Sequence, residues 1–168
     1  MAQTNTPITE EFLQSFADAF NAHDIDGIMT RMSDDCVFEA SSGPDVDGQK
    51  FIGQEQVRSA FLDVFATFPD AHWDNPRHFF SQTRGFTEWV FSGTKKDGTK
   101  VEVTGCDLFT FKNGKITVKN SYRKNRLWTR LNLEGPPINN VGPPLDAPIQ
   151  ALSNSGTVCN LYVEIHFK

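Results

Sequence analysis

Cysteine is scarce in this chain, and long apolar runs are missing. Cys36, Cys106 and Cys159 are the three cysteines among 168 residues, and they lie far apart. An odd and widely spaced set does not suit a disulfide framework, so we expect reduced thiols in a cytoplasmic protein. No stretch approaches the ~20 apolar residues that cross a bilayer. The polar segment 1–7 also lacks the apolar core of a signal peptide.

Positive charge is in deficit as well. The chain has 16 Lys and Arg residues against 21 Asp and Glu residues, which gives a formal net charge of −5. This balance argues against a nucleic acid or an anionic membrane surface as a partner. The sequence has no Gly-x-Ser-x-Gly elbow and no phosphate-binding glycine loop, so nucleophilic hydrolase and nucleotide-binding functions have no support.

Metal ligands at useful spacing are also lacking. His72, Asp74 and His78 form the densest group of suitable residues, but Pro76 interrupts it and no third ligand has a helpful spacing. We therefore expect no zinc site. His72 or His78 as a base in a pocket remains an alternative to a half-exposed strand histidine.

Aromatic residues, in contrast, are abundant. The 15 phenylalanines and three tryptophans fall within the first 128 residues, apart from Phe167. An excess of large aromatic side chains suits a core that also walls a hydrophobic pocket. Composition alone is equally consistent with a phenylalanine-rich core that has no pocket.

The first third of the chain predicts helices. Thr9 is suited to cap a helix in which Phe12, Phe16 and Phe20 form one apolar stripe, and Asp24 is suited to cap a short second helix. We expect Asp34-Asp35 to break this second helix, 36–40 to form a strand and 41–48 to form a loop. A third helix is predicted from Gly53 until Pro69 stops it.

Later segments change to the two-residue period of strands. Because helices come first and a meander of long strands follows, the pattern predicts an α+β domain with helices packed on one face of a curved sheet. The four predicted strands are His72–Phe80, Phe86–Thr94, Lys100–Phe111 and Lys115–Arg123.

The segment from Gly105 to Ile116 is the most informative. Asn113-Gly114 predicts a tight type I′ hairpin turn, because both central residues of that turn need a positive φ. In the alternating run before it, Asp107 shares one face with Phe109 and Phe111, and that face should be buried. A carboxyl group there must be hydrogen-bonded, ion-paired or held neutral.

The end of the chain differs from the rest. Five of the nine prolines fall between Pro136 and Pro148, which excludes a regular element there. Thr157 to Phe167 has the composition of one more strand, but nothing fixes its pairing. We therefore divide the chain into a domain over residues 1–126 and a proline-rich tail over 127–168.

Several segments together resemble the nuclear transport factor 2-like superfamily, in its SnoaL-like and ketosteroid isomerase-like branch. They are 21–28, 34–39, Phe68-Pro69-Asp70 and 105–116, and the resemblance covers roughly residues 8–126. It implies helices that form a cone with a strongly curved, mixed or antiparallel sheet around an apolar cavity. It also implies a homodimer, a small hydrophobic ligand, and neither a metal nor an organic cofactor.

The resemblance also assigns positions. Asp107 falls where ketosteroid isomerase keeps a protonated aspartic acid in its oxyanion hole. Phe16 replaces the tyrosine of that hole and Ala40 replaces the general base, so steroid isomerisation by that mechanism is not expected. Lys119 and Ser121 take the places of the histidine and aspartate that handle protons in SnoaL-like cyclases; the essential aspartate of limonene epoxide hydrolase also maps near Ser121, so that activity is not expected either.

Two functions stay open at this point. One is a cofactor-free isomerase or cyclase in which Asp107, Ser121 and Lys119 are catalytic; the other is a non-catalytic module that holds a ligand or a partner subunit. A Lys119–Asp107 contact would keep Asp107 ionised, and would either bind a polar ligand head or serve as a structural salt bridge. The expected substrate-binding residues are Phe16, Phe20, Ala40, Phe61, Phe65, Trp73, Trp89, Phe109 and Arg123.

Overall fold

The structure, a computed structural model, describes residues 6–125, and these belong to one compact unit. The predicted tail over 127–168, its strand and Cys159 lie outside the described residues. The elements, in chain order, are α1 (Glu10–Asn21), α2 (Ile25–Thr30), β1 (Met32–Glu39), β2 (Lys50–Ile52), α3 (Gly53–Thr67), β3 (His72–Phe80), β4 (Arg84–Thr94), β5 (Lys100–Lys112) and β6 (Lys115–Arg123).

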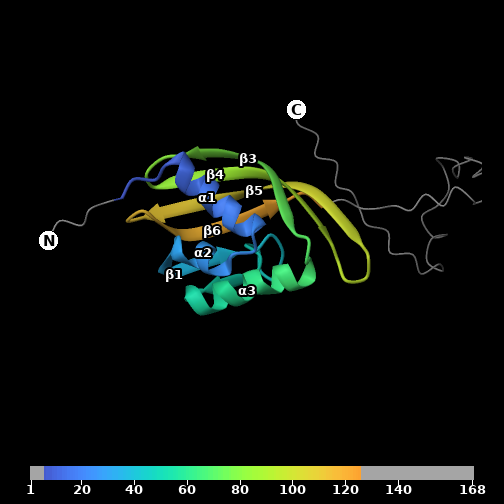
Figure 1. Cartoon of the computed structure of the whole chain (residues 1–168). Helices are drawn as coiled ribbons and strands as arrows, with labels where there is room; N and C mark the ends of the chain where they lie inside the picture. The colour runs from blue at the N-terminus through green and yellow to red at the C-terminus, as the bar shows by residue number, and fades with distance from the viewer. Residues whose placement is uncertain (1–5, 126–168) are drawn as a thin grey trace, which may run out of the picture. The chain divides into compact units, whose positions relative to one another are not determined.

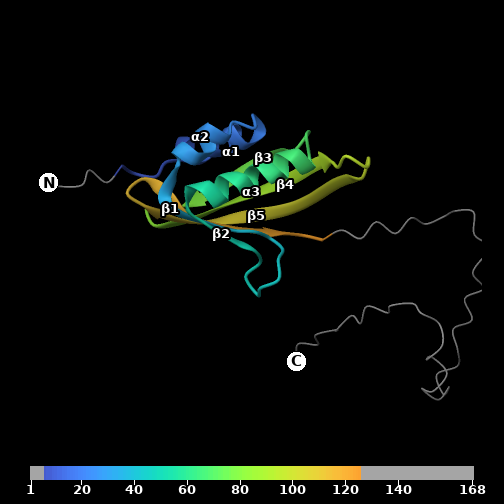
Figure 2. The ribbon, with the colours of Figure 1, turned by 90° about the horizontal axis from the view of Figure 1, so that it is seen from below.

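The six described strands form one curved sheet in the order β2-β1-β6-β5-β4-β3 (Figure 1). The β1–β6 pair is parallel and the other four pairs are antiparallel, so the sheet is mixed. Figure 2 shows α1, α2 and α3 on the same face of this sheet. The predicted α+β class and the curved, mixed sheet are confirmed, and the sheet is not closed.

The helices begin and end where local chemistry directs them. Thr9 Oγ1 accepts a hydrogen bond from the Phe12 amide at the start of α1, and Asp24 Oδ1 accepts one from the Gly27 amide at the start of α2. Such caps satisfy amide groups that have no partner within the helix. At its other end, α3 stops at Thr67, two residues before Pro69, as the sequence predicts.

The strands agree with prediction except near β1. Asn113 and Gly114 have φ of 53° and 72°, as a type I′ turn requires. β1, however, begins at Met32 and runs through Asp34-Asp35, which we expected to be a break. Both carboxylates point to solvent, in a part of β1 whose register with β6 is irregular. The short strand β2 was not predicted; its three residues pair only with β1.

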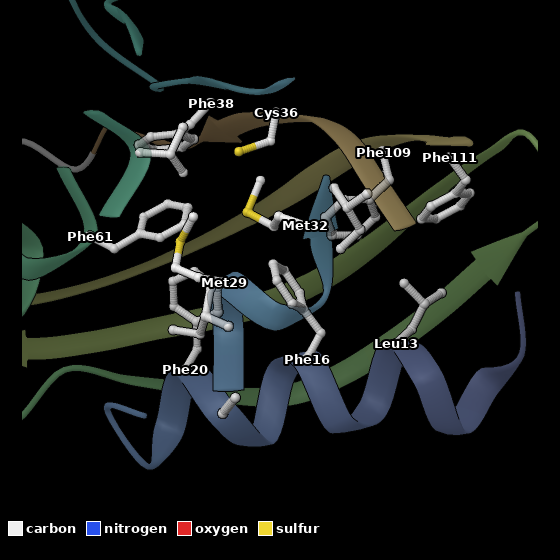
Figure 3. Packing of buried hydrophobic residues seen from close by; sticks show 14 of the residues in the cluster. Leu13, Phe16, Phe20, Met29, Met32, Cys36, Phe38, Phe61, Phe109 and Phe111 are labelled. Carbon is white, nitrogen blue, oxygen red and sulfur yellow. The ribbon is translucent and has the colours of Figure 1, made fainter. Parts of the chain in front are cut away.

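Aromatic rings from α1 and α3 join the helices to the sheet (Figure 3). Phe16 meets Phe109 edge to face, with ring centres 5.8 Å apart, and Phe20 meets Phe61 in the same way at 5.0 Å. Each such pair adds about 0.5–1.5 kcal/mol beyond simple burial. Phe20 also contacts Trp73 of β3 at 5.3 Å. These ring contacts hold α1 against β5, β3 and α3.

Two further observations concern the described part of the chain. None of its helices combines the length and hydrophobicity needed to cross a bilayer. Cys36 and Cys106 are free thiols, and burial raises the pKa of both. The cytoplasmic location and the homodimer stay predictions.

Candidate functional site

A cavity of about 320 Å³ lies between α1, α3 and the helix-covered face of the sheet. Aromatic side chains form the largest group in its wall, and its polar groups come from β6, from α3 and from the loop after β1. A smaller cavity of about 30 Å³ adjoins it, since Phe20, Trp73, Trp89 and Lys119 line both. The side chains that line the larger cavity include Phe20, Phe38, Ala40, Phe51, Phe61, Phe68, Trp73, Trp89, Phe91, Lys119, Ser121 and Arg123.

Asp107 lies on the cavity side of β5 and is only 7% exposed. Three donors hold its carboxylate. Oδ1 accepts from Lys119 Nζ at 2.7 Å and from Ser121 Oγ at 2.5 Å, and Oδ2 accepts from Trp89 Nε1 at 3.0 Å. A carboxylate offers about four acceptor positions, so these contacts leave about one, on Oδ2. The predicted contact between Asp107 and Lys119 is thus present, in a buried ion pair.

Lys119, from β6, is 6% exposed. Its ammonium donates to Asp107 and also to Ser121 Oγ at 2.8 Å. The same nitrogen lies 5.4, 5.0 and 5.9 Å from the ring centres of Phe20, Phe38 and Phe61. Ring faces attract a cation, so three rings and one carboxylate together hold the charge in place. An ammonium has three protons, and two are used here, which leaves one for a ligand oxygen.

Trp89 connects β4 to this group. Its side chain is buried, and the adjacent Glu88 lies on the other face of β4 and pairs with Arg77. The indole lies over Gly105 on the neighbouring strand, where a side chain would collide with it. Gly105 therefore lets the indole reach Asp107.

The sequence-predicted site residues divide into three sets. Asp107 lines the smaller cavity together with Phe16 and Phe109. Phe65 lines neither cavity; its ring stacks on His23 at 4.3 Å, so the geometry gives it no ligand contact. The remaining predicted residues, Phe20, Ala40, Phe61, Trp73, Trp89, Lys119, Ser121 and Arg123, line the larger cavity.

Four lining aromatics were not among the predicted residues: Phe38, Phe51, Phe68 and Phe91. Phe38 matters most, because it stands opposite Lys119 in the parallel β1–β6 pair and its ring faces the ammonium. The parity of Phe91 with Trp89 on one strand was a usable signal. Phe38 had the same signal from its parity with Ala40, but nothing local indicated the parallel pairing that places it opposite Lys119.

His78 is near the site without lining it. Its Nδ1 lies 2.8 Å from Thr87 Oγ1 and its Nε2 lies 3.3 Å from Gln14 Oε1. Thr87 is buried and lines the smaller cavity beside Asp107. Burial lowers the pKa of His78, against the smaller opposing effect of Glu10 and Asp18. A neutral imidazole that accepts from Thr87 and donates to Gln14 satisfies both contacts.

Other parts of the described chain offer no rival site for chemistry. Within residues 6–125, no group of three His, Cys, Asp or Glu side chains could hold a metal ion. A hollow of about 590 Å³ lies mainly on the outer face of the sheet, and its lining includes Arg77, Glu88, Cys106 and Lys124. It contains none of the Asp107, Lys119 and Ser121 side chains, so the inner cavity remains the candidate site.

Known proteins share this architecture. The family model of the SnoaL-like domain matches residues 13–119. No curated protein sequence matches the chain at a significant level. A protein from Xanthomonas campestris pv. campestris assigned as a polyketide cyclase is similar with a TM-score of 0.61 and 20% identity, over 68% of this chain and 88% of that one.

Two further solved structures were obtained with small molecules. A ketosteroid isomerase-like protein from Catenulispora acidiphila, in complex with trimethylamine, has a TM-score of 0.60 and 19% identity, over 68% of this chain and 86% of that one. TerC, co-crystallised with polyporic acid, has a TM-score of 0.57 and 18% identity, over 68% of this chain and 89% of that one. At these identities the likeness establishes the fold.

Proposed function

Since the chain belongs to the SnoaL-like domain family, we propose that it binds a small apolar carbonyl compound and catalyses its isomerisation or cyclisation without a cofactor. Membership of this family supports a ligand-binding or isomerase/cyclase-type function. That TerC was crystallised with polyporic acid is consistent with an organic ligand for this fold.

One observation supports the proposal above all: the buried Asp107–Lys119 ion pair forms part of the wall of the smaller cavity, and Lys119 also lines the larger one. An ammonium in an apolar site stabilises negative charge on a ligand oxygen far better than one in water. Lys119 has one proton left for such an oxygen, and Asp107 holds the ammonium in position.

The reaction then has two steps. Oδ2 of Asp107 takes a proton from the carbon next to the carbonyl, and the C–H electron pair forms an enolate whose oxygen accepts from Lys119. For isomerisation of a β,γ-unsaturated ketone the enolate is a dienolate, and Asp107 returns the proton to its γ carbon, which moves the double bond into conjugation. For cyclisation, the enolate carbon bonds to a second carbonyl carbon, and the proton goes to that carbonyl's oxygen. Neither route requires an oxidant, a reductant or a metal ion.

A non-catalytic binding protein is the second candidate. The observation in its favour is that three donors already hold the Asp107 carboxylate. In a binding protein, this carboxylate positions Lys119 and takes no proton. In that case Lys119 binds a ligand oxygen and no bond is broken.

Deuterium exchange separates the two candidates. 2-Tetralone, an apolar ketone with an acidic C–H bond, is incubated with the protein in D₂O and its C1 protons are followed by NMR, with affinity from calorimetry. If Asp107→Asn binds 2-tetralone as wild type does but loses the exchange, Asp107 is the base. Asp34→Asn, an exposed carboxylate on β1 outside both cavity linings, is the matched control and should keep the exchange.

If wild type binds the ketone but does not accelerate exchange, and Asp107→Asn only weakens binding or stability, the protein is a binding module. Lys119→Met should weaken ketone binding under both candidates. Unchanged ketone affinity in this variant would therefore contradict the proposed role of Lys119.

A further inference from the structure

Resting on the proposed function, we infer that the ligand is an amphipathic keto acid whose carboxylate is bound by Arg123 at the mouth of the cavity. The placement of cationic groups along β6 determines the charge and the length of this ligand.

Two cationic side chains and one anionic side chain line the larger cavity. Lys119, Arg123 and Asp63 are the charged side chains that line it. The ammonium of Lys119 is neutralised by Asp107 behind it. Within the described residues, Arg123 forms no ion pair, and it is exposed to solvent. A guanidinium in this situation is available to bind a carboxylate through two parallel hydrogen bonds, and the exposure limits the cost of removing water.

A cationic ligand fits the cavity poorly. The aromatic rings that would surround a ligand cation, Phe20, Phe38 and Phe61, already face the Lys119 ammonium. A second cation among these rings would lie beside the Lys119 ammonium, and the lining carboxylate of opposite charge, Asp63, is exposed on α3. The Catenulispora relative in complex with trimethylamine thus gives no guide to the ligand charge here.

β6 also sets the length of the ligand. Lys119, Ser121 and Arg123 alternate onto the same face and line the same cavity. At about 3.3 Å per residue, the Cα atoms of Lys119 and Arg123 lie roughly 13 Å apart. A ligand that reaches both cations therefore has a carbonyl oxygen at one end, an apolar segment beside the aromatic wall, and a carboxylate at the other end.

The test uses ω-phenyl keto acids of increasing length: 4-oxo-4-phenylbutanoate, 6-oxo-6-phenylhexanoate and 8-oxo-8-phenyloctanoate. Each is compared with its methyl ester, which keeps the ketone and removes the negative charge. Calorimetry at constant ionic strength gives the affinities of wild type and of two variants, Arg123→Gln and Lys124→Gln. Lys124 is the matched control, because it carries the same charge one residue later but lines only the outer hollow.

We expect wild type to bind at least one acid about tenfold more tightly than its ester. Arg123→Gln should lower the acid to the affinity of the ester and leave the ester unchanged, and Lys124→Gln should behave as wild type. Equal affinities for acid and ester in wild type, an equal loss in both variants, or no binding across the series would overturn the inference. Ester binding that depends on Lys119 but shows no preference for the acid would overturn it and leave the proposed function standing. If the protein prefers the acid through Arg123 but does not accelerate deuterium exchange, the inferred carboxylate site would be supported and the proposed catalysis would be contradicted.

Discussion

Trp89 and Gly105 face each other on β4 and β5, and the indole ring fills the space where a side chain at position 105 would begin. A Cβ placed there would lie 2.3 Å from Cη2 of Trp89 and 2.4 Å from the carbonyl oxygen of Tyr122. Neither neighbour yields easily, because one is a buried ring and the other is backbone. The glycine therefore sets the position of the indole whose N–H holds Asp107.

Gly105→Ala should consequently destabilise the protein by about 1–3 kcal/mol, as overpacking in a filled core does. The indole must move, so the hydrogen bond to Asp107 should lengthen or break, and Trp89 fluorescence should shift. Denaturant unfolding and emission spectra measure both effects. Cys106→Ala, one residue later on the opposite face of β5, is the control and should leave the emission unchanged. An unchanged spectrum in Gly105→Ala would contradict the packing argument.

The β5–β6 turn gives a second prediction. Gly114 has a φ of 72°, and a Cβ there would come within 2.8 Å of Thr6 Cβ and 2.9 Å of Thr6 O. Gly114→Ala should lower the free energy of unfolding by about 1–3 kcal/mol, because alanine is strained at this left-handed φ and its Cβ would crowd Thr6. Asn113→Gly, at the neighbouring φ of 53°, needs no new contact and should change stability little. Thermal unfolding of the two variants measures this difference in stability. Equal melting temperatures would contradict the predicted strain at Gly114.

This turn also explains how much of the site could be predicted from the sequence. The two-residue turn at Asn113-Gly114 pairs Phe111 with Ile116, and this register continued unchanged would set Asp107 opposite Asn120, with Lys119 and Ser121 on the other face. In the structure Asp107 pairs with Ser121 and Phe109 with Lys119, which leaves Lys119 diagonal to Asp107 and within reach. A one-residue shift in the β5–β6 register between Thr110 and Phe111 brings Lys119 and Ser121 onto the face of Asp107, and the turn residues alone do not predict this shift.

Contacts between segments that are distant in the sequence could not be predicted from local patterns either. Phe38 faces Lys119 only because β1 and β6 pair in parallel, and the connection between them contains most of the domain. No turn fixes that register, and an irregularity after Met32 shifts it. β2 was missed because three residues are too few to show a two-residue period, and it exists only through its pairing with β1.

His78 predicts how stability depends on pH. Its folded-state pKa lies below the ordinary value because the side chain is buried. As pH falls below about 6.5, the unfolded chain therefore takes up a proton before the folded protein does. The free energy of unfolding should decrease from that pH down to the lower folded pKa, with no further loss from this group below it.

His78→Gln removes this titration, so its stability should fall less steeply with decreasing pH across that window than wild type does. Thr87→Val is the companion variant: it keeps the imidazole but removes the hydroxyl that contacts Nδ1. It should retain a pH dependence. Urea midpoints at half-unit pH intervals measure the slopes, and parallel curves for wild type and His78→Gln would exclude His78 as the source.

The last prediction concerns the Asp107–Lys119 ion pair, which is buried and therefore differs from an ion pair on the surface. The two side chains are 9% and 8% exposed, and Lys119 Nζ lies 2.7 Å from Asp107 Oδ1. Removing one partner leaves the other charge buried and uncompensated, which typically costs about 3–5 kcal/mol. Lys119→Met and Asp107→Asn should each destabilise the protein by about this amount.

The double variant Lys119→Met/Asp107→Asn should be more stable than the sum of the two losses predicts, with a coupling energy of about 2 kcal/mol. The amide oxygen of the introduced asparagine would still accept from Trp89, and no buried charge would remain. Guanidinium unfolding introduces salt, so urea is the denaturant of choice. Additive losses would show that the two charges do not stabilise each other.

Lys50 and Glu39 provide the control cycle, because they form an ion pair at 3.2 Å with the Lys50 side chain 41% exposed. Water and salt screen such a pair, so its coupling should be much smaller and should vanish in about 1 M NaCl. The coupling between Asp107 and Lys119 should persist in the same salt, since ions do not reach it. A coupling that disappears with salt in both cycles would mean that solvent reaches the cavity wall, and the electrostatic stabilisation proposed for a ligand oxygen would then be lost as well.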